Sequence, residues 1–341
     1  MSNEFRVGLS ADLDNGKGGF SWGEISIETL APLKWEFLKP TGTNFTPESV
    51  SGFHAIAFAG PGVTSESFAS PAESPLVISR FGVGYDNIDL AACTRAGVAL
   101  TITPDGSQKP VATAALMMVL STMHRVVAKD ALARTHGWDK RLQGLGQGLN
   151  GKTVATIGFG NIATEFFRLI APFDCTRIAV DPFKRQSDGD LHNVTIVDLD
   201  TAMAKADVIV VMAVLTPETR HMINAEKLSK MKPNAIIVNM SRGPIINEAD
   251  LISVLSSGAI AGAGLDVFET EPPAKDNPLF AMENVVVTPH NIAWTDELAL
   301  GMGRSAFTAI KAISTGQNPQ FVVNRDVLET PQFLAKIEQW R

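Results

Sequence analysis

Cysteine and tyrosine are scarce in this chain of 341 residues, and the chain has no excess of positive charge. Its two cysteines, Cys93 and Cys175, form no C-x-x-C pair, so the sequence predicts no disulfide framework and fits a reducing cytoplasm. Lysine and arginine together number 29 against 36 aspartate and glutamate, a formal net charge of −7, and no basic run is present. This balance argues against nucleic acid and anionic membranes as partners.

Long hydrophobic runs and metal-ligand clusters are also missing from the sequence. No apolar stretch approaches the ~20 residues that a membrane helix needs, and residues 1–10 lack the charged-then-apolar pattern of a signal peptide. No group of histidines and cysteines has metal-ligand spacing, so no metal is expected. The length predicts two domains, each with a core of its own, in a cytoplasmic protein.

What is present is the order of elements of a dinucleotide site, between Thr153 and Asp181. A short apolar run leads into Gly158, Gly160 and Ala163 in G-x-G-x-x-A spacing, and a helical pattern and a second apolar run follow. In such a site the first glycine allows the strand-to-helix turn and the second lets a pyrophosphate approach the backbone. The amide groups at the helix N-terminus then favour the phosphates.

The residue at the end of the second apolar run bears on the choice of cofactor. Asp181 can accept hydrogen bonds from an adenosine ribose, and its charge would repel a 2′-phosphate. The sequence therefore predicts NAD rather than NADP. Lys184 and Arg185 keep NADP open as the less favoured alternative.

From Thr153 onward, strand-like apolar runs alternate with helical stretches. This alternation predicts a parallel sheet with helices on both faces, whose functional groups gather at the carboxyl ends of the strands. Arg242 and His290 each follow one such run, and a third run carries Asp266 and leads to Glu269 and Glu271. A cation, two acids and a histidine are thus expected near one edge of the sheet.

The first 105 residues read as a smaller α/β unit with short apolar runs. Long helical patterns at Pro110–Ala133 and from Trp294 onward connect it to the second unit. We therefore expect a discontinuous substrate domain of residues 1–108 and 295–341, and a nucleotide-binding domain of residues 109–294. In the first domain, Val83 lies between two glycines directly after a strand, where backbone amides can hold a carboxylate, although a plain turn is an equal reading.

Hydride transfer needs a cation to orient the substrate, an acid/base, and a carboxylate beside that base. Arg242, His290 and Glu271 suit these roles. Each alone could be an ordinary surface or loop residue, but their joint position at strand ends favours a catalytic site.

With these residues in place, the sequence resembles the D-isomer-specific 2-hydroxyacid dehydrogenases, a family that includes D-lactate, glycerate/hydroxypyruvate and D-3-phosphoglycerate dehydrogenases. The resemblance covers most of the chain. It rests on the motifs GVGYDNID (82–89), IGFGNIA (157–163), LTPETRHMIN (215–224), VNMSRGPIINEADL (238–251), GLDVFETEP (264–272) and TPH (288–290).

The resemblance implies a specific reaction and specific roles. It implies NAD(H)-dependent interconversion of a 2-oxo acid and a D-2-hydroxy acid, with Arg242 binding substrate, His290 as acid/base and Glu271 paired with it. Glu269 would be a non-catalytic neighbour. The backbone of Val83 and Gly84 would hold the substrate carboxylate.

The resemblance also implies the cofactor contacts, the fold and the assembly. Asp266 and the Met240 backbone would hold the nicotinamide amide, and Asn161 and Ile162 would contact the pyrophosphate. The fold would be α/β, with a flavodoxin-like substrate domain and a Rossmann NAD-binding domain, both doubly wound parallel sheets, around a cleft. Family members are mostly homodimers, so a homodimer is expected.

Some features depart from the family pattern and leave the substrate open. Trp294 follows the histidine motif, where it could shape the substrate pocket or simply pack between domains, and the 14–23 loop is atypical. Two other functions stay open as well: a non-enzymatic, co-repressor-like protein that senses NAD(H), and a phosphite dehydrogenase-like enzyme.

Overall fold

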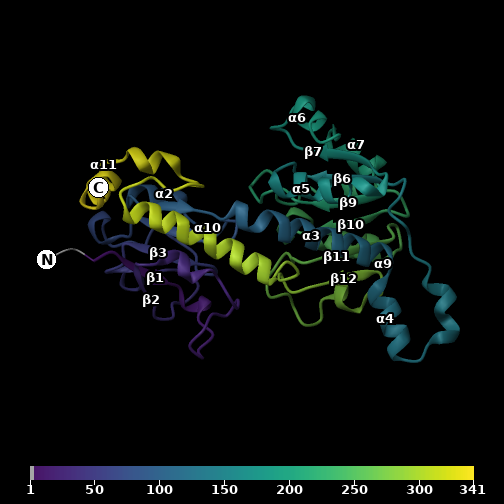
Figure 1. The fold of residues 1–341 in the computed structure, drawn as a ribbon. Helices are drawn as coiled ribbons and strands as arrows, with labels where there is room; N and C mark the ends of the chain where they lie inside the picture. Colours follow the sequence, from purple (N-terminus) through teal and green to yellow (C-terminus); the bar gives the residue numbers. More distant parts are fainter. Residues whose placement is uncertain (1–3) are drawn as a thin grey trace. The chain divides into compact units, whose positions relative to one another are not determined.

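A computed structural model describes residues 4–341, so residues 1–3 of the expected substrate domain lie outside the described part. The chain divides into two compact units. Unit 1 contains residues 4–110 and Trp294–Arg341, and unit 2 contains Val111–Ala293. Each unit is built on its own parallel sheet with helices around it, which is the α/β class that the sequence predicts (Figure 1).

Unit 1 contains a five-stranded parallel sheet in the order β2-β1-β3-β4-β5. Its central strand, β3, is buried along its whole length, whereas the edge strand β2 carries exposed Lys34 and Glu36. Short apolar runs suit such central strands because both faces of a parallel sheet are covered. The strands are β1 (Arg6–Leu9), β2 (Lys34–Phe37), β3 (Ala55–Phe58), β4 (Val77–Arg80) and β5 (Ala99–Thr101).

The longest helix wholly within unit 1 is α10 (Asp296–Ser314), which packs against β3 and β4. It begins where the Thr295 side chain accepts a hydrogen bond from the Leu298 N–H group, and its buried face supplies much of the core. The shorter helices of the unit are α1 (Pro47–Val50), α2 (Leu90–Arg95) and α11 (Pro331–Ile337).

Unit 2 contains a seven-stranded parallel sheet in the order β12-β11-β10-β9-β6-β7-β8. From β6 the strands that follow in sequence are added first on one side, as β7 and β8, and then on the other, from β9 to β12. The point between β6 and β9 where the order changes side is where doubly wound sheets bind their ligands. The strands are β6 (Thr153–Ile157), β7 (Thr176–Val180), β8 (Thr195–Ile196), β9 (Val208–Val211), β10 (Ile236–Asn239), β11 (Gly262–Leu265) and β12 (Val285–Val287).

The core of unit 2 lies on both faces of this sheet, because alternate side chains of a strand point to opposite faces. In β9, Ile209 and Val211 belong to one apolar cluster, whereas Val208 and Val210 belong to the other. The helices that contribute to these clusters are α5 (Asn161–Leu169), α7 (Leu199–Lys205), α8 (Ala225–Leu228) and α9 (Glu248–Ser256), with part of α3 (Pro104–Met123). The short helix α6 (Gln186–Asp190) contacts the edge strand β8.

One long helix expected over Pro110–Ala133 is in fact two helices. The first, α3, begins six residues earlier and contains Pro110 inside it, and the second is α4 (Val126–Arg134). The break lies at Arg125, whose φ of 55° places it in the left-handed region and ends the regular helix. Sequence periodicity continues across such a break, because one residue changes direction without changing the apolar spacing.

Among residues 4–341, no single helix is long and apolar enough to cross a membrane. The bent pair α3 and α4 meets the length and composition criteria only when both helices are taken together.

Candidate active site

The turn after β6 has the geometry of a phosphate-binding loop. Gly158 has φ of 100°, and a Cβ atom there would lie 2.8 Å from the backbone of Met212, so only glycine fits. Its N–H group donates to the Val180 carbonyl oxygen over 2.8 Å, which joins the turn to β7. The sequence signal at Gly158 therefore corresponds to a backbone requirement.

The second glycine of the motif faces open space. Gly160 is the N-cap of α5, and a Cβ atom at this position would meet nothing within 4 Å. Asn161 and Ile162 are the first two residues of the helix, where the N–H groups point out of the helix end and the helix dipole is positive. Open space beside this helix N-terminus fits a pyrophosphate of the expected cofactor.

Asp181 lies at the end of β7, directly beside this turn. Its Oδ2 atom accepts a hydrogen bond from the Phe159 N–H group over 3.0 Å, and its Oδ1 atom accepts one from the Phe183 N–H group over 3.0 Å. These bonds fix the carboxylate next to the glycine motif, as a ribose-binding role requires. Lys184 and Arg185 are exposed in the loop that follows.

Arg242 lies in the turn that follows strand β10. The side chain of Asn239 holds this turn, because its amide donates to the Arg242 carbonyl oxygen over 3.0 Å and its oxygen accepts from the Ser241 N–H group over 3.1 Å. The Arg242 guanidinium donates to the Ser241 carbonyl oxygen over 2.8 Å. Met240, also in this turn, is joined to the β9 strand through its N–H group.

Glu271 and His290 are bonded to each other. The His290 Nδ1 atom lies 2.7 Å from Glu271 Oε2, and the Phe268 N–H group donates to Glu271 Oε1 over 3.0 Å. Burial would raise the pKa of the Glu271 carboxyl, but the hydrogen bonds from His290 and Phe268 hold that pKa below its ordinary value. The carboxylate is therefore charged and oriented toward the imidazole.

Asp266 anchors the segment that carries His290. The His290 N–H group donates to the Asp266 carbonyl oxygen over 2.8 Å, and His290 has a left-handed φ of 54°. The buried Asp266 carboxylate accepts three further bonds through Oδ1, from the Thr288 hydroxyl and from the N–H groups of Asn291 and Ile292. Burial raises the pKa of Asp266. This anchoring role was not anticipated from the sequence, which pointed to Asp266 only as a nicotinamide contact.

An apolar cavity of about 280 Å³ lies beside the Glu271–His290 pair. Phe268 and Phe280 form part of its wall and meet edge to face, with ring centroids 5.6 Å apart. Its remaining lining residues are Glu271, Pro272, Pro273, Val287, Thr288, Pro289 and His290.

In unit 1, the expected carboxylate-binding turn follows β4. Gly82 has φ of 123° and is held by Thr103, whose hydroxyl accepts its N–H group over 2.8 Å. Val83 and Gly84 follow as partly exposed turn residues. The turn is therefore ordered on one side and accessible on the other.

An aromatic stack lies in the same unit. The rings of Trp22 and Trp294 stack with centroids 4.6 Å apart, and Trp22 meets Phe81, which directly precedes Gly82, edge to face at 6.3 Å. Trp294 remains 56% exposed. Trp22 was not singled out from the sequence, because a tryptophan in a glycine-rich loop carries no signal of its long-range partner.

A second histidine–carboxylate pair was also missed. His221 Nε2 lies 2.6 Å from Glu269 Oε1, and Glu269 precedes Glu271 by two residues. The sequence placed Glu269 as a neighbour of the catalytic acid, but gave His221 no role. Their separation of 48 residues hides the pairing from any local pattern.

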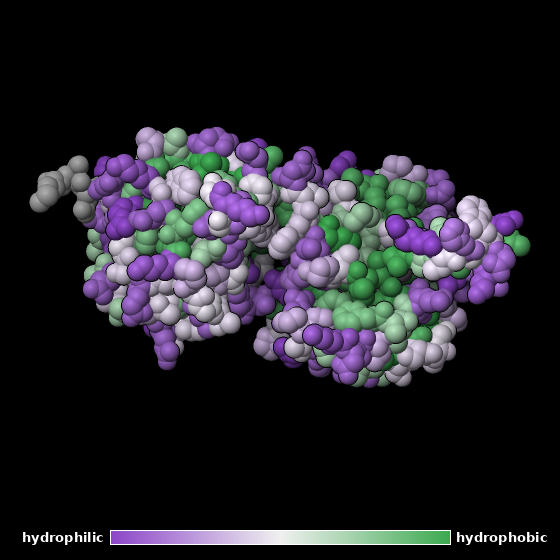
Figure 2. All heavy atoms as spheres, turned by 90° about the horizontal axis from the view of Figure 1, so that it is seen from below, coloured by the Kyte–Doolittle hydropathy of each residue, from purple (hydrophilic) through white to green (hydrophobic). Residues whose placement is uncertain are grey.

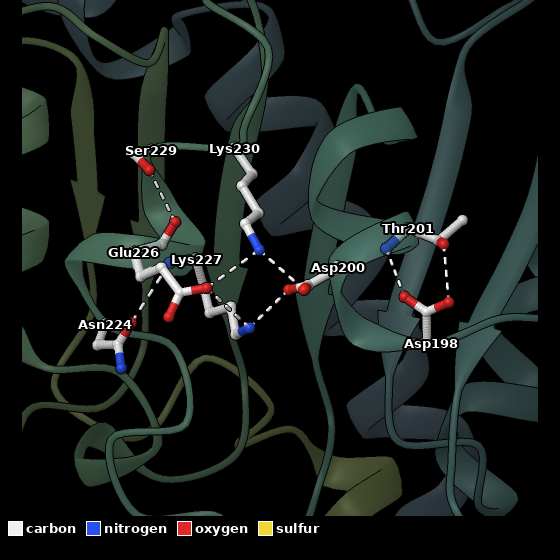
Figure 3. Close-up of polar contacts among 8 residues, drawn as sticks. All are labelled: Asp198, Asp200, Thr201, Asn224, Glu226, Lys227, Ser229 and Lys230. Atoms are coloured by element: carbon white, nitrogen blue, oxygen red, sulfur yellow. Dashed lines mark hydrogen bonds and ion pairs between the residues drawn. The ribbon is translucent and has the colours of Figure 1, made fainter.

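The part of the chain that the structure describes contains no group of three or more histidine, cysteine, aspartate or glutamate side chains that could hold a metal ion. Unit 2 also contains a cluster of ion pairs outside the site. There Lys227 and Lys230 converge on Asp200 and Glu226 (Figure 3).

Comparison with known families identifies one family over most of unit 2. Residues 116–291 match the family described as D-isomer specific 2-hydroxyacid dehydrogenase, NAD binding domain. The matched stretch includes both glycines of the motif, Asp181, Arg242, Glu271 and His290.

Two curated relatives are similar over most of this chain. A glyoxylate reductase from Thermofilum pendens is 36% identical over 258 residues, covering 74% of this chain and 76% of the relative. A D-3-phosphoglycerate dehydrogenase from Methanocaldococcus jannaschii is 38% identical over 255 residues, covering 74% of this chain and 48% of the relative. The alignment thus spans about half the length of this second relative.

A solved structure is similar over nearly the whole chain. The apo structure of D-lactate dehydrogenase from Escherichia coli matches with a TM-score of 0.74 and 24% sequence identity, covering 94% of this chain and 100% of that one. At this identity the likeness is one of fold.

Proposed function

Because the chain belongs to the D-isomer specific 2-hydroxyacid dehydrogenase family, whose members are NAD-binding oxidoreductases, we propose that it interconverts a 2-oxo acid and a D-2-hydroxy acid with NAD(H). The observation that carries this proposal is the 2.7 Å bond between Glu271 and His290. It occurs at the sheet edge that also bears Arg242 and the glycine motif.

Different residues of unit 2 have different roles in the proposed reaction. The nicotinamide, when bound, supplies or accepts the hydride. Glu271 holds the Nδ1 side of His290, so His290 would give a proton to the carbonyl oxygen through Nε2 during reduction. The Arg242 guanidinium would bind the substrate carboxylate and polarise its carbonyl group.

We propose NAD rather than NADP as the cofactor. The charge of Asp181, held in place by two backbone N–H groups, favours a free ribose 2′-hydroxyl and opposes a 2′-phosphate. Gly158 and Gly160 with Asn161 and Ile162 would bind the pyrophosphate. The nicotinamide amide would be held by Met240 and Asp266.

Unit 1 would provide the substrate-binding half, as the expected division at 108/109 and 294/295 implies. The backbone N–H groups of Val83 and Gly84 would hold the substrate carboxylate. Trp294, stacked on Trp22 and more than half exposed, would contact the side chain of the 2-oxo acid. The substrate would be unphosphorylated, because Arg80 is the one basic residue between residues 60 and 90 of this unit.

A homodimer is the proposed assembly. Several large apolar side chains are exposed on α4 and on the 3₁₀ helix after it, η4 (Trp138–Gly144), and a group of exposed apolar side chains is typical of an interaction surface. Figure 2 shows hydrophobic residues at the surface of unit 2. On α4, on η4 and directly after η4, the most exposed apolar side chains are Val127, Trp138, Leu142 and Leu145. The two free thiols fit a reducing, cytoplasmic location.

The direct test is NADH oxidation against a panel of 2-oxo acids, repeated with NADPH. Glyoxylate, pyruvate, hydroxypyruvate and phenylpyruvate sample increasing side-chain size. We expect turnover of at least one of them, faster with NADH than with NADPH. NADH binding without any turnover across the panel would contradict the proposal and favour a protein that senses NAD(H).

A further inference from the structure

The second histidine–carboxylate pair of unit 2, His221 and Glu269, has no part in the reaction proposed above. Both side chains are only about one-third exposed, at 35% and 31%, and their polar atoms lie 2.6 Å apart. We propose that His221 and Glu269 are positioning residues that hold the turn of Glu271, and through it the orientation of His290. The inference rests on the proposed function of Glu271.

Glu269 forms hydrogen bonds through its backbone N–H group and contacts polar groups through both carboxylate oxygens. Oε1 meets His221, and Oε2 accepts a hydrogen bond from the Glu248 N–H group over 3.0 Å. In return, the Glu269 N–H group donates to Glu248 Oε2 over 2.9 Å. Because Glu248 is the first residue of α9, these reciprocal bonds attach the turn to the start of a helix. Because both of its carboxylate oxygens have partners, Glu269 holds the turn in place and does not serve as a second acid/base.

His221 connects Glu269 to the segment that follows Arg242. Its N–H group donates to the Pro244 carbonyl oxygen over 2.8 Å, and its own φ of 52° is left-handed. Two residues later, the Ile223 N–H group donates to the Ile245 carbonyl oxygen over 3.2 Å. The His221 ring thus projects from a backbone that is itself fixed to the Arg242 segment.

The third side of the arrangement is a close backbone contact. A Cβ atom on Gly243 would overlap the Phe268 carbonyl group and the Glu269 backbone nitrogen, so only glycine can occupy this position. The segments of His221, Gly243 and Glu269 therefore form a closed ring of contacts. The His221–Glu269 bond is the side-chain contact that joins the first and third of these segments.

The turn held in this way determines where the Glu271 carboxylate lies. The Phe268 N–H group donates to Glu271 Oε1, so the same short turn that Glu269 anchors also orients the acid that faces His290. Displacing a catalytic group by about 1 Å can cost about 10²-fold in rate. Loss of the His221–Glu269 contact should therefore act on the chemical step and leave the distant cofactor turn intact.

Kinetics of His221→Ala and Glu269→Ala in the full chain test this role. We expect kcat for 2-oxo acid reduction to fall by about tenfold or more, while KM changes less and the NADH dissociation constant stays within about twofold. His221→Gln should restore most of kcat, because its amide group can still donate to Glu269. Lys230→Ala, which removes two ion pairs of the cluster in Figure 3, is the matched control and should keep kcat.

A double-variant comparison separates positioning from an independent effect. If the pair acts through Glu271, His221→Ala should cause no more than about twofold further loss of kcat in a Glu271→Gln background. Equal losses in both backgrounds, or wild-type kcat in a folded His221→Ala protein, would overturn the proposal. Should the alanine variants fail to fold, Glu269→Gln keeps the side-chain shape and is expected to lower kcat in the same direction.

A spectroscopic readout makes the test independent of turnover. The His290 Nδ1 proton, bonded to a carboxylate, is expected as a downfield proton resonance that His290→Gln removes. We expect this resonance to weaken or move in His221→Ala and to persist in Lys230→Ala. An unchanged resonance in His221→Ala would refute the positioning role, whereas an absence of 2-oxo acid reduction by the wild-type chain would refute only the proposed function.

Discussion

The Oε2 atom of Glu271 lies 2.7 Å from the Nδ1 atom of His290, so a proton could pass between the ring and a substrate through Nε2. The carboxylate is itself held by the Phe268 N–H group, and the histidine backbone is held by Asp266. Backbone contacts thus fix the positions of both residues, as a general acid with one fixed tautomer requires.

Replacing His290 by alanine tests the proposed acid/base directly. General acid catalysis contributes about 10²–10⁴-fold, so kcat for 2-oxo acid reduction should fall by at least two orders of magnitude. NADH binding, measured by fluorescence, should change little because the glycine motif is untouched. His124→Gln, at an exposed position after α3, should turn over like the wild type. Near-normal turnover by His290→Ala would exclude the mechanism.

Stability at acidic pH should depend on Glu271. Its pKa is held below the ordinary value, so the folded state binds a proton less readily than the unfolded state. The stabilisation is therefore fully present above the ordinary carboxyl pKa and is lost as the pH falls through the lowered value. We expect the difference in free energy of unfolding between wild type and Glu271→Gln to be constant near neutrality and to shrink below pH ~4.5.

Urea unfolding at a series of pH values measures that difference. Glu338→Gln, which removes an exposed ion-paired carboxylate near the C-terminus, serves as the control variant. A difference for Glu271→Gln that stays flat down to acidic pH would contradict the assignment of a lowered pKa to this carboxyl.

Asp181→Ser should weaken the preference for NADH. The substitution removes the charge that opposes a 2′-phosphate and an acceptor for the ribose hydroxyl groups. We expect the ratio of kcat/KM for NADH to that for NADPH to fall by about tenfold or more, mainly through a higher KM for NADH. Asp139→Asn, exposed at the start of η4, should leave the ratio unchanged. An unchanged ratio in Asp181→Ser would show that other residues select the cofactor.

Much of this site could be predicted from the sequence because it lies at the carboxyl ends of parallel strands. Residues that follow different strands of one parallel sheet must meet at one edge, whatever their distance along the chain. That rule predicts that Arg242, Glu271 and His290 lie at one edge of the sheet. The glycine motif was equally readable, because the positive φ of Gly158 leaves no other residue type possible.

The supporting contacts could not be predicted in this way. The His221–Glu269 pair spans 48 residues and joins two loops, and no periodic pattern encodes a contact between loops. The second role of Asp266 depends on the backbone conformation of the His290 segment, which no local sequence pattern encodes. The break at Arg125 is likewise a single-residue change of backbone direction within an apolar pattern that continues.

The stacked pair Trp22 and Trp294 leads to a prediction about substrate side chains. An exposed indole face favours planar apolar groups, and aromatic contacts contribute about 0.5–1.5 kcal/mol beyond the area they bury. Trp294→Ala should therefore lower kcat/KM for phenylpyruvate relative to glyoxylate by about three- to tenfold. Trp35→Ala, which removes a partly exposed tryptophan of the edge strand β2, controls for loss of surface aromatic area. A higher relative kcat/KM for phenylpyruvate in Trp294→Ala would instead mean that the indole restricts the pocket to small acids, and that the stack excludes large side chains rather than binding them.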